Sequence, residues 1–503
     1  MNSIDNLLRN LRVGSDRPRA ANADPVATAT AAADAPAPAP PPTPASGSPV
    51  VAPPRKSGID ELLTRIQPPR AEGQSSSRPR PGVAALSEFE PAAPRNLEEA
   101  GLNESDIVGL ILRFLLPRSI ETGYRISNQL GLRFPIVDQV LRQLKQDKLV
   151  TYKNTLTAGD YLYELTDEGR DRGERLGRQT TYCGSAPVPL SQYFVSVRAQ
   201  TLVGRKPSLA GIRQAFSDLN LPEKLISNVG QAIHSGRGMF LYGPPGNGKT
   251  SIAERITRTF GDYIWIPRAL SASGEILRLY DPNRHKLAPD LPAEVMKEID
   301  GRWVRIERPT IIAGGELRME NLEITYIRNT GIGEAPLQLK ANCGTLLIDD
   351  FGRQRMPVDE LLNRWIVPLE QRHDYLHLES GRSIQVPFDQ LIVFSSNMEP
   401  KDLVDDAFLR RIPYKVEVHD PTEAEFRELF GKLCTQLGFV CRTEELDYLI
   451  GNHYRAKNLP LRFCHPRDIL RQIENRCSLH DLPREVTREA LDQAIDNYFS
   501  IMM

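Results

Sequence analysis

The chain has 503 residues, enough for about two to four domains, and its 63 Lys and Arg residues balance 64 Asp and Glu residues. This balance excludes a strongly basic or acidic protein, so the net charge alone identifies no partner. Six cysteines are scattered without a Cys-x-x-Cys pair, which argues against a zinc site or a disulfide framework and fits a reducing compartment.

Residues 1–98 form a Pro/Ala-rich tail that we expect to be disordered, because it has too few large apolar residues to offset the entropy of ordering. Charges within "MNSIDNLLRNLRVG" make this N-terminus a poor signal peptide, so we expect a cytoplasmic protein. Residues 3–11 and 58–66 share the pattern Ile-Asp-x-Leu-Leu at helical spacing. They predict a recognition helix, present twice, that docks on a protein partner. The alternative is chance, since short Leu-rich turns are common.

Residues 99–178 predict an α+β winged helix. A helix after the cap residue Asn103 is followed by a helix-turn-helix pair, "GYRISNQLGL" and "PIVDQVLRQLKQDKLV", and by wing strands in "VTYKN" and "YLYELTDEGR". The apolar run "DIVGLILRFLLPR" contains an arginine and ends at a proline, so it predicts no membrane insertion. Arg142, Lys145 and Lys153 offer cations to DNA, but acidic and basic residues nearly cancel across the domain. We therefore favour a protein-interaction or positioning role and keep DNA binding as the alternative.

Residues 179–236 predict a helical lead-in, 237–419 an α/β nucleotide-binding domain and 420–503 a helical lid. In "MFLYGPPGNGKTSIAERI" a strand precedes the pattern G-x-x-x-x-G-K-[ST] and a helix follows it, which predicts a phosphate-binding loop for ATP. Backbone N–H groups and the helix N-terminus would surround the phosphates. Lys249 would reach the β- and γ-phosphates, and Thr250 would bind Mg²⁺. The predicted binding residues are Gly243, Pro244, Pro245, Gly246, Asn247, Gly248, Lys249, Thr250 and Ser251.

The apolar run in "GTLLIDDFGR" predicts a buried strand that ends in two adjacent carboxylates. Like charges at such a position are costly unless a cation compensates them. A strand that ends in Asp, downstream of a phosphate loop, is where the carboxylate that holds Mg²⁺ belongs. We therefore assign Asp349 to the metal and expect Asp350 to face the attacking water.

Residues 237–503 resemble an AAA+ ATPase, a P-loop NTPase with a parallel sheet flanked by helices and a C-terminal helical lid. The run "APLQLKANCGTLLIDDFGRQRMPVDELLNRWIVPLEQR" resembles the MoxR-like and enhancer-binding branch. Together with "SAPVPLSQYFVSVRAQ", "AFLRRIPYKVEV" and "CHPRDIL", it is most similar to bacterial proteins described as ATPases with chaperone activity associated with Flp pilus assembly. This resemblance covers roughly residues 180–503.

The resemblance implies further catalytic residues. Asn397, at the end of the strand "QLIVFSSN", would orient water near the γ-phosphate. Arg410 or Arg411, with Arg411 preferred, would project into the nucleotide site of a neighbouring subunit and stabilise charge on the transferred phosphoryl group. Arg467, at the start of a lid helix, would sense the γ-phosphate. An arginine that acts across a subunit boundary implies a homo-oligomer, and the family implies a hexameric ring.

Two features depart from the family pattern. The second acid is usually Glu, whereas Asp350 is one methylene shorter, so we expect slow turnover. The segment between Trp265 and Lys340 is long and predicts a β-rich insertion without the GAFTGA loop of transcription activators. Within it, Tyr280 or the "IIAGGEL" turn could face a ring pore or could equally serve packing.

Three functions are consistent with the sequence. The favoured one is a ring-forming ATPase that couples ATP hydrolysis to remodelling or assembly of a protein partner. The first alternative is an ATP-regulated, DNA-binding, transcription-associated protein that uses the winged helix. The second, a scaffold that does not hydrolyse ATP, fits poorly with a full set of site residues.

Overall fold

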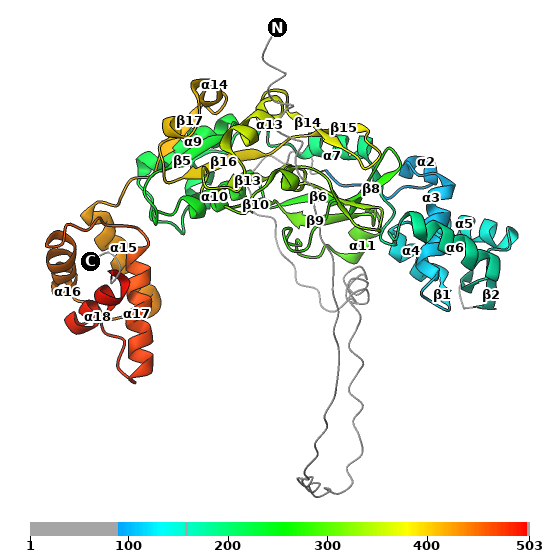
Figure 1. Ribbon diagram of the computed structural model, residues 1–503. Helices are drawn as coiled ribbons and strands as arrows, with labels where there is room; N and C mark the ends of the chain where they lie inside the picture. The colour runs from blue at the N-terminus through cyan, green and yellow to red at the C-terminus, as the bar shows by residue number, and fades with distance from the viewer. Residues whose placement is uncertain (1–88, 156–158, 500–503) are drawn as a thin grey trace, which may run out of the picture. The chain divides into compact units, whose positions relative to one another are not determined.

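The computed structural model describes residues 89–155 and 159–499 (Figure 1). The two tail motifs, 3–11 and 58–66, lie outside the described residues. Residues 89–98, which the sequence assigned to the tail, make packing contacts: the Phe89 ring lies 5.6 Å from that of Trp303, and Ala92 forms a β-bridge with Ile299. The packed part of the chain therefore begins before the predicted boundary at residue 99, because Phe89 finds an aromatic partner in the insertion. No helix among the described residues is long and apolar enough to cross a membrane.

The N-terminal part follows the predicted order of helices and hairpin strands. Its helices are α2 (Leu97–Ala100), α3 (Glu104–Leu115), α4 (Gly123–Leu130), α5 (Phe134–Gln146) and α6 (Asp167–Gln179). Its strands, in the antiparallel order β1-β3-β2, are β1 (Glu121–Thr122), β2 (Val150–Thr155) and β3 (Tyr161–Leu165). The last residues of the predicted wing start α6 instead, because the Thr166 hydroxyl accepts from the Gly169 backbone N–H at 3.0 Å and caps this helix.

Between this part and strand β5, which leads into the phosphate loop, lie one short strand and three helices. They are β4 (Val188–Pro189), α7 (Leu190–Gln200), α8 (Leu209–Ala215) and α9 (Glu223–Ser235). Helix α9 ends at Gly236, whose φ of 64° lets the chain turn directly into the first core strand.

A five-stranded parallel sheet forms the core of the α/β region, in the order β10-β13-β16-β5-β17. Its strands are β5 (Met239–Tyr242), β10 (Thr310–Ala313), β13 (Thr345–Ile348), β16 (Leu391–Ser396) and β17 (Tyr414–Glu417). Leu346 and Ile348 pack on one face with helix α13 (Val358–Gln371), whereas Leu347 packs on the other with α9 and α10 (Lys249–Ile256). This burial on both faces explains why the strands are apolar throughout.

The region between Trp265 and Lys340 is β-rich, as predicted, but it is not all insertion. Strand β10 lies within it and is an edge strand of the core sheet, because Thr310–Ala313 pair in parallel with Thr345–Ile348. The remaining strands form a ribbon and most of a second sheet of order β11-β12-β8-β7-β4. They are β6 (Tyr263–Pro267), β7 (Ala269–Ala272), β8 (Glu275–Arg278), β9 (Trp303–Glu307), β11 (Thr325–Ile327) and β12 (Ile332–Glu334).

A hairpin follows helix α13. Helix α13 ends at Gln371 because Arg372 adopts a φ of 57°, and β14 (His373–His377) then pairs with β15 (Ser383–Pro387). The short elements of this region are η2 (Thr257–Phe260), α11 (Ala293–Met296), η3 (Met319–Leu322), α12 (Leu337–Lys340), η4 (Pro400–Asp402) and α14 (Asp406–Leu409).

The C-terminal part is helical and has its own apolar core. Its elements are α15 (Glu423–Leu437), α16 (Thr443–Tyr448), the π-helix η5 (Leu449–Arg455), α17 (His465–Leu479) and α18 (Arg488–Phe499). Phe426 and Phe430 of α15, together with Ile469 and Ile473 of α17, are completely buried in this core. Helix α15 starts with a capping box in which Thr422 and Glu425 each accept from the other's backbone N–H.

Candidate functional site

The phosphate loop joins β5 to α10, as its sequence pattern requires. Gly243, Gly246 and Gly248 have φ angles of 137°, 83° and 78°, in the region that favours glycine. Space reinforces this requirement at Gly243, where an added Cβ would lie 2.3 Å from the carbonyl oxygen of Val418. The loop therefore holds its backbone in a shape that other residues adopt only with strain.

Lys249 lies in the loop with its ammonium group turned inward. Its Nζ donates to the carbonyl oxygens of Gly243 and Pro244, at 2.8 and 3.0 Å, and to Oδ1 of Asn397 at 2.7 Å. The side chain is 7% exposed, and this burial lowers the pKa of the lysine, while Asp349 and Asp350 act in the opposite direction. An ammonium group that has lost most of its hydration is suited to bind an anionic phosphate.

The two adjacent carboxylates at the end of β13 have different surroundings. Asp349 Oδ2 accepts from the Thr250 hydroxyl at 2.7 Å, which brings together the two oxygen ligands predicted for Mg²⁺. Asp349 is half-buried. Asp350 is exposed and has a φ of 50°, in the left-handed region. The two carboxylates therefore differ in their exposure to solvent.

Asn397 connects the lysine and the second carboxylate. It follows β16, which lies between β5 and β13 in the sheet. While its Oδ1 accepts from Lys249, its Nδ2 donates to Asp350 Oδ1 at 3.3 Å. The strand order therefore brings Lys249, Asp349, Asp350 and Asn397 together at the carboxyl ends of three parallel strands.

This is the fold of an AAA+ P-loop NTPase. The prediction of a parallel α/β sheet with a phosphate loop and a helical C-terminal region is confirmed by the strand order and by the helices that follow β17.

The phosphate loop opens into a cavity of about 670 Å³. Arg467 lines it, and Arg471 lies one helical turn further along α17. Two further parts of the wall were not predicted from the sequence: the segment 217–221 and side chains of α15, including Lys432 and Leu433. The four-residue spacing of Arg467 and Arg471 signals a shared helix face, but no local pattern identifies 217–221 as part of this wall.

Arg410 and Arg411 do not line this cavity. They precede β17, which runs parallel to β5, so they lie at the end of the sheet opposite the phosphate loop. Arg411 donates to Oε1 of Glu370 at 2.7 Å and to the carbonyl oxygen of Ala407 at 2.9 Å, whereas Arg410 is exposed. Arg411 thus has partners within its own chain, and Arg410 extends into solvent.

The two candidate pore features of the insertion make local contacts. The Tyr280 ring lies 6.0 Å from the His285 ring, and the Arg268 guanidinium lies 5.7 Å from the centre of the Tyr280 ring. In the "IIAGGEL" turn, Glu316 Oε1 accepts from the Gly314 backbone N–H at 3.1 Å, and Leu317 is buried.

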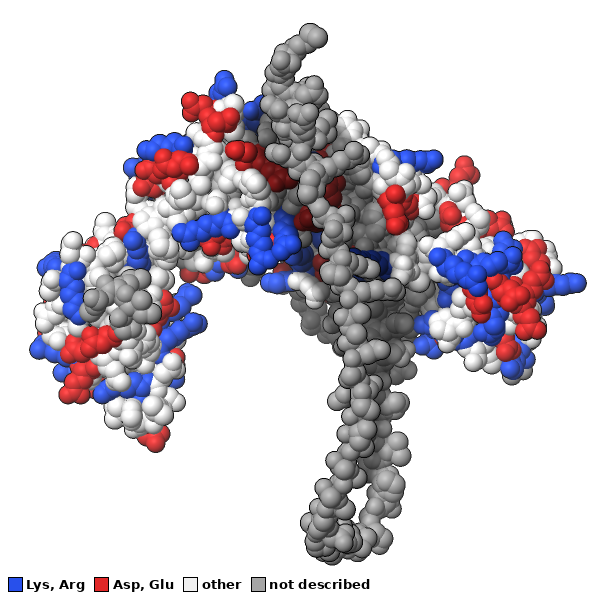
Figure 2. All heavy atoms as spheres, in the orientation of Figure 1, with Lys and Arg blue, Asp and Glu red and all other residues white. Residues whose placement is uncertain are grey.

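The cations predicted to face DNA have acidic or aromatic partners. Arg142 pairs with Asp138 at 2.8 Å, Lys153 pairs with Glu164 at 3.3 Å, and the Lys145 ammonium lies 3.5 Å from the centre of the Tyr152 ring. Figure 2 shows Lys and Arg interspersed with Asp and Glu over the visible face of α4, α5 and α6. Among the described residues of this face, Lys and Arg form no continuous stripe (Figure 2).

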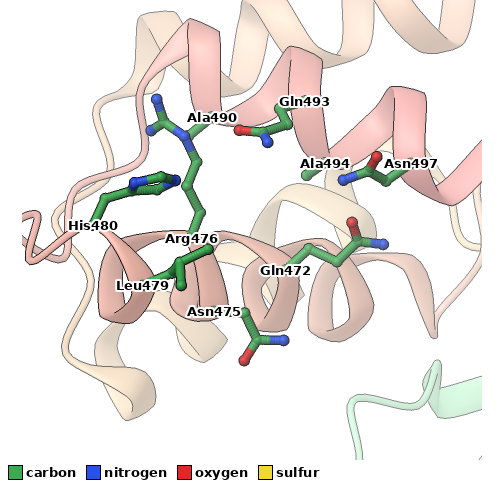
Figure 3. A pocket seen from close by; sticks show the side chains of 9 residues that line it. All are labelled: Gln472, Asn475, Arg476, Leu479, His480, Ala490, Gln493, Ala494 and Asn497. Carbon is green, nitrogen blue, oxygen red and sulfur yellow. The ribbon is translucent and has the colours of Figure 1, made fainter.

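A second cavity, of about 330 Å³, lies between α17 and α18 (Figure 3). Arg476 and His480 lie at one end, and Leu479 beside them is 78% exposed. The remaining lining residues are mostly amides and alanines: Gln472, Asn475, Ala490, Gln493, Ala494 and Asn497. None of these residues belongs to the phosphate loop.

A family model and several solved structures match parts of the chain. A family model described as "Domain of unknown function (DUF8689)" matches residues 422–497. No curated protein matches the chain. Among solved structures, a point mutant of RuvB from Thermotoga maritima aligns at 10% identity and a TM-score of 0.31, over 59% of this chain and 72% of that one. NtrX from Brucella abortus, in complex with ADP, aligns at 15% identity and a TM-score of 0.36, over 61% and 60%. Similarities at this level assign no activity.

Proposed function

We propose that the chain is a Mg²⁺-dependent ATP hydrolase that forms a ring and couples ATP binding and hydrolysis to remodelling or assembly of a protein partner. The observation that carries this proposal is the convergence of Lys249, Thr250, Asp349 and Asn397 at one edge of the sheet. Each of these side chains has a role in phosphoryl transfer, and they meet where a phosphate loop opens into a cavity.

The roles follow from chemistry and position. Lys249 binds the β- and γ-phosphates in place of Asn397 and the loop carbonyls. Thr250 and Asp349 would hold Mg²⁺, which neutralises charge that develops on the phosphates. Asp350 and Asn397 face the attacking water, and the exposed Asp350 carboxylate accepts its proton. Arg467 contacts the γ-phosphate from α17.

Oligomerisation belongs to this proposal because of where the arginines lie. Arg410 and Arg411 are at the opposite end of the sheet from the phosphate loop of their own chain. Either can stabilise a transferred phosphoryl group only in a neighbouring subunit. In a closed ring, which we propose to be hexameric, every nucleotide site receives such an arginine from a neighbouring subunit.

The finer assignment rests on the sequence resemblance. We propose a place in the MoxR-like branch and a chaperone-like role, with assembly of Flp pili as the candidate process and the cytoplasm as the location. The tail motifs 3–11 and 58–66 would recruit the protein partner, and two copies on one chain would raise its effective concentration.

Nucleotide titration tests the central claim. The wild-type protein is expected to bind a fluorescent ATP analogue in a Mg²⁺-dependent manner and to release phosphate from ATP. Lys249→Ala and Asp349→Asn are expected to lower phosphate release by about 100-fold or more, since each removes a charge that contacts phosphate or metal. Lys401→Ala serves as the control, because Lys401 is exposed and lies outside the cavity. A wild-type protein without affinity for adenine nucleotides contradicts the proposal.

A second candidate function is ATP-regulated DNA binding through α4, α5 and the β2–β3 hairpin. The observation that favours it is the order of these elements, a helix pair followed by a hairpin. Titration of the full-length protein with duplex DNA at several salt concentrations separates the candidates. A steep fall in affinity with salt supports DNA binding, whereas binding that is weak and independent of salt supports the protein-directed role.

A further inference from the structure

The phosphate loop is hydrogen-bonded to the C-terminal helical region. Asn247 lies between Gly246 and Gly248 in the loop and is 1% exposed. Its Nδ2 donates to Asp420 Oδ1 at 2.7 Å, and its Oδ1 accepts from the Phe463 backbone N–H at 3.3 Å. A buried amide of this kind is retained only where its hydrogen bonds are made.

Two further contacts involve the same segment. The Cys464 backbone N–H donates to the Gly246 carbonyl oxygen at 3.0 Å. Gly246 admits this approach because it has no side chain: an added Cβ would lie 2.7 Å from Cys464 Sγ. The segment 462–464 thus lies directly against the loop that would surround the phosphates.

Asp420 is the residue on which these contacts converge. It lies in the connection between β17 and α15, and its Oδ1 accepts from both Asn247 and the Arg462 guanidinium. The Asp420 carboxylate therefore links the phosphate loop, the connection between β17 and α15, and the segment that precedes α17.

We infer that Asn247 and Asp420 form a latch that couples the phosphate loop to the segment 462–464, so that nucleotide occupancy and the position of α17 are linked. This inference rests on the proposed function and adds its regulation. Asp420 is a positioning residue, since it acts through Asn247 and Arg462. The latch also gives a role to part of the region that the family of unknown function covers.

Hydrogen–deuterium exchange of the full-length protein without nucleotide tests the contact itself. Asn247→Asp places two carboxylate oxygens face to face, and exchange in peptides covering 461–471 is expected to rise about tenfold, as for the loss of one hydrogen bond to a charged group. Asp420→Asn in the same chain exchanges the amide and the carboxylate between the two positions. The double variant is expected to return to within about twofold of wild type.

The outcomes decide the inference in either direction. An Asn247→Asp variant that exchanges like wild type, or a double variant no better protected than the single one, overturns the latch. If exchange also rises in β16, the Asn247→Asp protein is destabilised as a whole. The latch is then supported only if adding Asp420→Asn restores the protection of 461–471. Asp402→Asn, an exposed carboxylate in η4, is the control that should leave 461–471 unchanged.

Coupling is tested by adding Mg²⁺ and ATPγS. In wild type the nucleotide is expected to protect 461–471 from exchange, and Asp420→Ala should lose most of this protection. The KM of Asp420→Ala for ATP is expected to stay within about threefold of wild type, while its kcat falls about tenfold. Protection that persists in Asp420→Ala overturns the coupling. A wild-type protein that binds no adenine nucleotide contradicts the proposed function, but it leaves the exchange comparison without nucleotide intact.

Discussion

Asp350 combines an unusual backbone conformation with the central catalytic role proposed here. Its φ of 50° lies in the left-handed region, which Asp and Asn tolerate better than other non-glycine residues. The Gln354 side chain supports this turn by donating to the carbonyl oxygens of Asp349 and Asp350, at 3.0 and 3.1 Å. The Asp349 carboxylate accepts from Thr250, and the Asp350 carboxylate is accessible to water.

Substitution of Asp350 separates the conformational role from the chemical one. Asp350→Asn keeps the turn but removes the base, so we expect an intact fold with ATP hydrolysis about 100-fold slower. Asp350→Glu moves the carboxylate forward by one methylene and is expected to hydrolyse ATP as fast as wild type or faster. Phosphate release and thermal unfolding measure the two properties. An Asp350→Asn protein as active as wild type would show that Asp350 is not the base.

At the scale of single elements, α6 is packed so closely on the hairpin that one of its glycines has no room for a side chain. A Cβ on Gly169 would lie 1.9 Å from the carbonyl oxygen of Leu149, whereas a Cβ on Gly177 of the same helix would meet no atom within 4 Å. Both glycines are helical, so their propensity costs are similar. Only their surroundings differ.

These two glycines make a matched pair of variants. Gly169→Ala forces α6 away from the hairpin, and we expect it to lower the free energy of unfolding by about 2 kcal/mol. Gly177→Ala should raise it by up to about 1 kcal/mol through helix propensity. Urea unfolding followed by circular dichroism compares them. If the two variants lose equal stability, the close approach of α6 to Leu149 is not a stabilising contact.

Local sequence patterns predicted the helices and strands themselves better than they predicted which of these elements pair or pack together. The phosphate loop and Asp349 could be assigned because each follows an apolar strand in a recognisable spacing, whereas Asn397 was assigned from the family resemblance. The parallel sheet brings all three together. Strand β10 was assigned to the insertion, because "TIIA" indicates a strand but not the edge of the core sheet on which it pairs. Lys432 and the segment 217–221 were missed because their place at the cavity depends on long-range packing.

At the scale of the whole molecule, the proposed ring depends on two neighbouring arginines with different surroundings. Arg411 is paired with Glu370, and Arg410 is exposed. The sequence favoured Arg411, but an arginine that acts on another subunit must be free to extend. The ion pair of Arg411 with Glu370 would have to break for this role, whereas Arg410 needs no such change.

Mixed assemblies test this proposal. Whichever of Arg410→Ala and Arg411→Ala removes the trans-acting cation is expected to lower ATP hydrolysis about 100-fold or more, and to lower the activity of wild-type subunits when mixed with them. Glu370→Ala is the control: it breaks the ion pair of Arg411 but leaves both cations. Activity that falls only in proportion to the added variant would contradict an active site shared between subunits.

The pairing of β5 also affects how the protein is made. The strand that leads into the phosphate loop has β16 and β17 as its two neighbours, and both come much later in the chain. A ribosome therefore releases β5 long before either partner strand exists, and closing such long loops is slow. During synthesis the apolar Met239–Tyr242 strand has neither sheet neighbour. Nascent chains would need protection from aggregation at this strand until Glu417 has emerged.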